Sequence, residues 1–125
     1  IAAWFALGEA YLRIGKTDSA RWAEQQIRVL NDKAPEGFAL LVKINLAQKN
    51  LVEARNTLKA GFKQNKQSAL LFLVQGETLV AGDSLDKALV AFAQAANAGP
   101  NNPAPYEAQA DIYHKQSRTG MAILN

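Results

Sequence analysis

Apolar residues recur along the chain at helical spacing, and short polar breaks separate one apolar stretch from the next. Near the start, Trp4, Leu7 and Tyr11 fall three and four residues apart, which places them on one side of an α-helix. The same pattern predicts helices over residues 2–15, 18–31, 36–48, 51–64, 69–81, 84–98 and 103–117, with a short further helix from about residue 120. Short connections place neighbouring helices antiparallel, so the pattern predicts an all-α chain of antiparallel helix pairs.

Polar residues at the breaks indicate where helices begin and end. Asn50, with Glu53 three residues later, is typical of a helix N-cap. The pair Asp83-Ser84, followed by Asp86, predicts the same kind of cap for the sixth helix. The glycine and proline that open GPNNPAP end that helix, and Asn102 is expected to cap the seventh.

The helical pattern repeats every 34 residues. One row of this repeat holds the aromatic residues Trp4, Phe38, Phe72 and Tyr106. A second row holds Ala20, Ala54, Ala88 and Ala122, and a third holds Gly8, Val42, Gly76 and Ala110. Aromatic residues form only 8% of the chain, so a chance row of four is improbable. Rows of small residues predict sites where the backbones of two helices come close.

These residues resemble the tetratricopeptide repeat (TPR), a helix–turn–helix unit with the pattern W-x₂-L-G-x₂-Y and later alanine, aromatic and proline positions. The third unit matches with Phe72, Gly76, Leu79, Ala88, Phe92, Ala95 and Pro100. The second unit departs from the pattern at Val42, Asn45 and Gly61. The first has Glu24 where an aromatic residue is usual and Asp32 where proline is usual.

The resemblance implies an α-solenoid of about three and a half units in a right-handed superhelix, with the first helix of each pair lining a concave groove. The repeats would cover about 1–34, 35–68 and 69–102, with an incomplete unit over 103–125, as a single array. The last unit lacks a capping helix, so we expect its open end to self-associate. The Ala-, Gln- and Asn-rich helices are also similar to TPR proteins of bacterial envelopes and exopolysaccharide export.

Composition adds few constraints. The 125 residues suit one domain, with 49% apolar and 20% charged residues. Without cysteine, disulfides and thiolate metal sites are excluded. No apolar run reaches the roughly 20 residues that cross a bilayer. Because the chain starts at Ile1, we interpret it as a fragment or a processed product. Its localisation stays open between the cytoplasm and the bacterial envelope, and the envelope is preferred.

Two short motifs are candidates for catalysis or nucleotide binding. The GKT at 15–17 resembles the end of a phosphate-binding loop, but the glycine required upstream is Ala10, and the preceding residues are helical. His114 follows Asp111 by three residues, but the pair would need a nucleophile or a further base, and Ser117 is a poor candidate near a helix end. A zinc site would need three or four converging ligands. We therefore predict no enzyme activity, no metal and no cofactor.

The groove positions implied by the resemblance form the predicted binding site. They are Phe5, Glu9, Leu12, Lys43, Leu73, Glu77, Asp111 and His114. Apolar and mostly acidic residues suit a peptide with basic and apolar side chains, although the apolar positions could equally be inter-repeat core. Phe5 and Glu9 stand where chaperone-binding relatives begin a clamp for a terminal carboxylate, so that ligand is not expected.

A basic run forms a second candidate surface. Residues 54–76 contain no acidic side chain but include Arg55, Lys59, Lys63 and Lys66. The first three form a stripe on one helix, which the resemblance places on the convex side. The stripe is either a solvated helix face or a site for an anionic polysaccharide or lipid headgroup. No aromatic residue interleaves it, so nucleic acid is not predicted.

The sequence thus favours a protein–protein interaction scaffold that holds a peptide or protein segment in its groove. The alternative is a structural spacer arm in a bacterial envelope assembly for polysaccharide export or protein sorting.

Overall fold

Seven helices make up the computed structural model, which describes the backbone of residues 1–124 and the side chains of residues 1–117. They are α1 (Ala2–Arg13), α2 (Thr17–Leu30), α3 (Pro35–Ala47), α4 (Leu51–Gln64), α5 (Ala69–Ala81), α6 (Leu85–Ala98) and α7 (Ala104–Leu124). All regular structure over this range is helical. The all-α prediction is confirmed, and the bounds of the first six helices agree with the expected ones within two residues.

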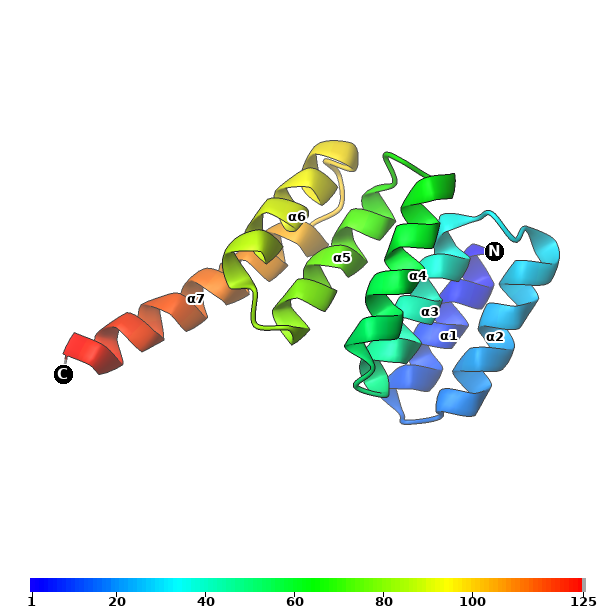
Figure 1. The fold of residues 1–125 in the computed structure, drawn as a ribbon, viewed down its shortest axis with the longest axis horizontal. Helices are drawn as coiled ribbons and strands as arrows, with labels where there is room; N and C mark the ends of the chain where they lie inside the picture. Colours follow the sequence, from blue (N-terminus) through cyan, green and yellow to red (C-terminus); the bar gives the residue numbers. More distant parts are fainter. Residues whose placement is uncertain (125) are drawn as a thin grey trace.

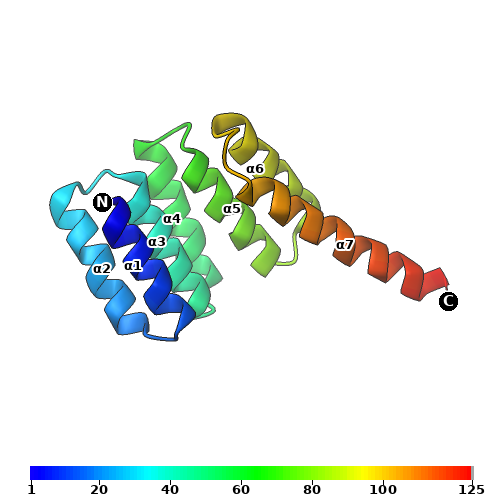
Figure 2. The same ribbon diagram turned by 180° about the vertical axis from the view of Figure 1, so that it is seen from behind.

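The helices pair as α1 with α2, α3 with α4 and α5 with α6 (Figure 1). The first helices also pack on one another, α1 against α3 and α3 against α5, and they lie toward the viewer in Figure 2. The second helices lie on the other side of the molecule. This two-layer arrangement places the groove positions of the first helices on one face.

The last helix departs from the prediction. We expected a break after residue 117 and a separate helix from about 120, but α7 runs without interruption from Ala104 to Leu124. No proline interrupts this stretch, and one glycine is tolerated inside a helix. The C-terminal half of α7 extends away from the other helices in both views (Figures 1 and 2). Ala122, the fourth alanine of its row, lies outside the residues whose side chains are described.

Two aromatic side chains of α7 are more exposed than the residues at the same repeat positions in earlier helices. Tyr106 and Tyr113 are 52% and 58% exposed. Trp4 and Phe72, the counterparts of Tyr106, and Tyr11 and Leu79, the counterparts of Tyr113, are only partly exposed. The ring centroids of Trp4 and Trp22 lie 5.1 Å apart in a T-shaped pair between α1 and α2. Aromatic residues of this row thus contact second helices, Trp4 on α2 of its own pair and Phe72 on α4 of the preceding pair, whereas Tyr106 on α7 is exposed.

The helix ends show which capping predictions hold. The Asn50 side chain accepts a hydrogen bond from the Glu53 N–H at 3.2 Å, and Asn102 Oδ1 accepts one from the Ala104 N–H at 3.0 Å. Ser84 occupies the N-cap of α6, but its side chain accepts no cap hydrogen bond, so that prediction is wrong in its chemistry. The Ser84 backbone N–H instead closes the preceding turn onto the Leu79 carbonyl at 2.8 Å.

The small-residue rows have two different packing roles. Ala20, Ala54 and Ala88 are completely buried between helices, as predicted. The glycines, in contrast, make room for a side chain and not for a second backbone. A Cβ at Gly8 would lie 2.4 Å from Leu40 Cδ2, and a Cβ at Gly76 would lie 2.4 Å from Phe92 Cε1. The expectation of close backbone approach at this row is therefore corrected.

Two departures from the repeat pattern are explained by buried polar pairs. Asn45, in a row that is otherwise Tyr or Leu, donates to the Thr57 hydroxyl at 3.2 Å within the core. Glu24, where an aromatic residue is usual, is buried and forms a two-point ion pair with Arg28 one turn later. The hydrogen bond to Glu24 raises the pKa of Arg28. Each polar residue is thus satisfied locally.

Candidate functional site

A row of charged side chains crosses three helices on the face of the first helices. The Lys43 ammonium on α3 lies 3.4 Å from a carboxylate oxygen of Glu9 on α1 and 3.3 Å from one of Glu77 on α5. The three residues are 34 positions apart, so consecutive repeats bring equivalent positions side by side. All three side chains remain partly exposed. We call this row the charge ladder.

The ladder changes the electrostatics expected for the groove. The row holds acidic residues at three of its four positions, Glu9, Glu77 and Asp111. In the structure, Lys43 pairs with both glutamates and thereby cancels part of their charge. The pairs are partly solvated, so they contribute little to stability. The uncompensated negative charge of the row is therefore smaller near α1 and α3 than the residue types suggest.

One cavity on this face lies between α1 and α3. It has a volume of about 250 Å³ and is lined by Glu9, Leu12, Arg13 and Lys43. Three of these are predicted site residues, and the structure brings them together. Arg13 was not predicted as a site residue. It lies four residues, about one helical turn, after Glu9, so it could have been found by including the next turn of the same helix face.

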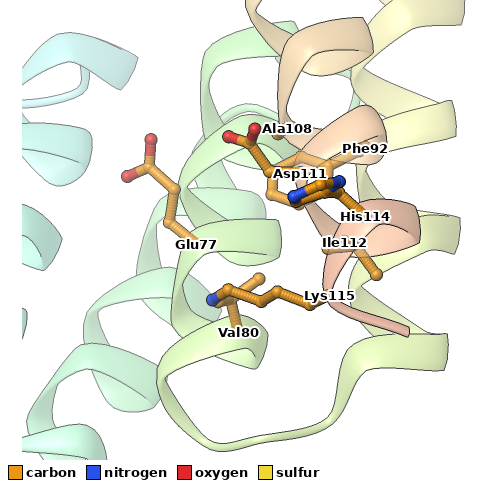
Figure 3. A pocket seen from close by; sticks show the side chains of 8 residues that line it. All are labelled: Glu77, Val80, Phe92, Ala108, Asp111, Ile112, His114 and Lys115. Carbon is orange, nitrogen blue, oxygen red and sulfur yellow. The ribbon is translucent and has the colours of Figure 1, made fainter. Parts of the chain in front are cut away.

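The second cavity, of about 410 Å³, lies between α5 and α7 (Figure 3). Its lining residues are Glu77, Val80, Phe92, Ala108, Asp111, Ile112, His114 and Lys115. Glu77 and Val80 come from α5, and Asp111 and His114 come from α7 on the other side. The close packing that joins α1 to α3 and α3 to α5 is not repeated to the same extent between α5 and α7, which leaves this space open.

The rim of this cavity is charged and its floor is apolar. Phe92 and Ile112 are almost fully buried and form the base. Asp111, His114 and Lys115 are exposed at the edge. Lys115, like Arg13, stands one turn beyond the middle row and was not predicted. The arrangement is that of a mostly apolar pocket with a few polar groups, a general property of ligand sites.

Three predicted site residues also pack against the core. Phe5 and Leu12 pack against the buried cluster that includes Ile27 and Leu40, and Leu73 packs against the cluster around Phe92. All three keep partial exposure, so they can border the groove while they pack on the core. Their contacts are those of the alternative interpretation, in which the apolar positions are inter-repeat core.

The basic residues lie away from the ladder. Arg55, Lys59 and Lys63 are exposed on α4, and Lys66 is exposed in the loop that follows it. The three residues on α4 therefore form the predicted stripe on a second helix. Lys66 is not part of this helix face.

The motifs weighed for chemistry are accounted for by the fold. Gly15 of the GKT stretch adopts a left-handed backbone conformation in the turn between α1 and α2, with φ of +77°. Within the described residues, no group of three or more His, Cys, Asp or Glu side chains could hold a metal ion. Over the same range, no helix is both long and apolar enough to cross a membrane.

Similar folds occur among solved structures of TPR domains. The first TPR of Spaghetti (RPAP3), bound to the HSP90 peptide SRMEEVD, has a TM-score of 0.67 and 16% identity, with 93% of this chain and 92% of that chain covered. The first TPR domain of human RPAP3 has a TM-score of 0.72 and 15% identity, with 94% and 92% covered. At this identity the likeness shows the fold alone, and the fold is TPR-like.

Sequence comparisons add a family. None of the curated proteins compared with this chain matches its sequence. The bacterial envelope origin that the composition suggested finds no support among the matches, and neither does the spacer arm that rested on it. A family model for the ChAPs, described as Chs5p-Arf1p-binding proteins, matches residues 3–125, and the chain therefore belongs to the ChAPs family.

Proposed function

We propose that this chain is a protein–protein interaction module that binds a peptide or protein segment along the face of α1, α3, α5 and α7. The observation that carries the proposal is the charge ladder, because it aligns equivalent positions of successive repeats. The cavities at its two ends supply apolar surface beside these charges. An extended surface of this kind suits a long, narrow ligand.

The comparisons support a protein partner. The ChAPs are described as binding Chs5p and Arf1p, and the Spaghetti TPR was solved with an HSP90 peptide. The acidic residues of SRMEEVD would meet Glu77 and Asp111 in this chain, so we do not expect that peptide to bind here. A segment with an apolar side chain next to a Lys or Arg fits better, since the apolar group enters the α5–α7 cavity and the cation meets these carboxylates.

A peptide array tests the proposal. We expect the chain to retain peptides in which Leu or Phe stands beside Lys or Arg, and to leave acidic peptides unbound. Asp111→Lys should weaken this retention, because it reverses a charge at the cavity rim. Asp18→Lys, on α2, makes the same charge change away from this face and serves as the matched control.

The proposal would be refuted by either of two results. One is preferential retention of acidic peptides. The other is an equal loss of retention in Asp111→Lys and Asp18→Lys, which would indicate a general effect of net charge and not a site between α5 and α7.

A further inference from the structure

A third cavity lies between α4 and α5, on a different side of α5 from the charge ladder. It has a volume of about 410 Å³ and is lined by Arg55, Leu58, Lys59, Phe62, Gln75, Thr78 and Leu79. We call it the α4–α5 cleft. At about 100° per residue, Gln75 and Leu79 point to the opposite side of α5 from Leu73 and Glu77. The cleft is therefore separate from the groove.

The floor of the cleft is apolar and firmly packed. Leu58 is buried, and Phe62 and Leu79 are partly exposed into the cavity. The Phe62 and Phe72 ring centroids are 5.1 Å apart, which holds the Phe62 ring in place. The Thr78 hydroxyl donates a hydrogen bond to the Val74 carbonyl at 2.8 Å, so this donor is satisfied within α5 and does not point to a ligand. The floor thus offers a fixed surface for apolar side chains.

The rim of the cleft is cationic and uncompensated. Arg55 and Lys59 stand one helical turn apart on α4, and both are exposed. The guanidinium of Arg55 reaches over the end of α5, since a Cβ built on Gly82 would lie 3.2 Å from Arg55 Nη2. Among the side chains of residues 1–117, neither cation forms an ion pair, whereas Lys43 on the other face has two carboxylate partners.

We propose that the α4–α5 cleft binds an acidic amphipathic helix of a partner protein. The apolar face of that helix would cover Leu58, Phe62 and Leu79, and its carboxylates would pair with Arg55 and Lys59. The charges match in spacing, because Asp or Glu residues four positions apart rise by about 6 Å, as Arg55 and Lys59 do. Lys63, one further turn along α4, extends the same row.

Other anionic partners fit the cleft less well. A polysaccharide would satisfy the cations but leave the apolar floor, which includes Phe62, in water. A flat membrane surface would meet the rim without entering the recess below it. An amphipathic helix satisfies the charged rim and the apolar floor together.

Fluorescence anisotropy with a designed peptide tests the proposal. The probe is a fluorescein-labelled peptide of about 15 residues, in which leucines occupy one helical face and glutamates recur four positions apart beside them. We expect saturable binding that weakens about tenfold or more in Arg55→Glu/Lys59→Glu. The control variant Lys33→Glu/Lys87→Glu makes the same charge change at exposed positions outside the cleft and should bind like the unmodified chain.

A second pair of variants tests the floor without touching the core. Gln75 lines the cleft and is only partly exposed. Gln75→Leu should strengthen peptide binding by enlarging the apolar floor, and Gln75→Glu should weaken it by placing a negative charge near the peptide. Circular dichroism of each variant should show unchanged helix content.

Several outcomes would overturn the proposal. One is the absence of binding up to millimolar peptide, and another is equal binding of a scrambled peptide with the same composition. A general polyanion surface would be indicated if a heparin fragment displaced the peptide. In that case the affinity for heparin would fall in Arg55→Glu/Lys59→Glu as much as the affinity for the peptide does, and Gln75→Leu would not change it. Vesicles of phosphatidylserine and phosphatidylcholine that bind with the same dependence would show a lipid surface.

Discussion

Replacement of Gly76 by alanine tests the packing at the centre of the third repeat. The new Cβ would lie 2.4 Å, 2.6 Å and 2.7 Å from three atoms of the Phe92 ring. Ordinary van der Waals contact begins near 3.4 Å, so the ring and the helix that carries it must separate by about 1 Å. Phe92 is only 1% exposed and packs within its cluster, so a shift of the ring disturbs these buried contacts, even though one side of the ring borders the α5–α7 cavity.

Two opposing effects set the size of the change. Overpacking of a core costs about 1–3 kcal/mol. Alanine in place of a mid-helix glycine stabilises the helix by about 1 kcal/mol. We therefore expect Gly76→Ala to lower the free energy of unfolding by up to about 2 kcal/mol. Without the steric conflict, the same substitution would raise it.

A double-mutant cycle isolates the steric part. Phe92→Leu removes the ring atoms that the new Cβ would meet, at a cost of its own of about 1–2 kcal/mol. In that background Gly76→Ala should become neutral or stabilising, which corresponds to a coupling energy of about 1–3 kcal/mol. Urea denaturation followed by circular dichroism at 222 nm measures all four free energies. If Gly76→Ala had the same effect in both backgrounds, contact with Phe92 would not be the reason for glycine at this position.

Three further substitutions test other features of the fold. Ala54→Phe should destabilise the chain by about 1–3 kcal/mol or more in urea, because Ala54 is completely buried between α3 and α4; a neutral result would contradict the repeat register. Arg28→Ala should lower the free energy of unfolding by about 1–3 kcal/mol, because it leaves the buried Glu24 carboxylate without a partner. Glu24→Leu should lower it less, because the Arg28 side chain that loses its partner is 54% exposed; the reverse order would refute this account. Tyr113→Lys should reduce concentration-dependent association in sedimentation velocity, since the exposed Tyr113 face attracts a second apolar surface; an unchanged profile would place any association elsewhere.

The helices and their register could be predicted from the sequence because the interactions that define them are local. Backbone hydrogen bonds span four residues, and the apolar face of each helix recurs every three or four positions. The alanine row marked buried positions correctly at Ala20, Ala54 and Ala88. The end of the last helix was predicted wrongly for a related reason: a break in α7 needs a local stop signal, and this stretch offers only one glycine and no proline after residue 105.

The groove residues were placed on one face by the 34-residue repeat, but their contacts were not predictable from it. Lys43 could have pointed into solvent; its bridge to Glu9 and Glu77 depends on the spacing and angle between three helices. Likewise, Gly8 and Gly76 signalled a close contact, and only the packed structure shows that side chains of Leu40 and Phe92 fill the space.

The sequence by itself determined that this chain forms stacked helix pairs and which residues face each side, because periodicity within a helix fixes direction. Tertiary structure decided where space is left between the helices. The cavity between α5 and α7 exists because α7 packs less closely on α5 than α5 does on α3, and the α4–α5 cleft sets Arg55 and Lys59 above an apolar floor. Such spaces depend on how side chains far apart in the chain fill the volume between helices. The pattern of residues along the sequence does not determine that volume.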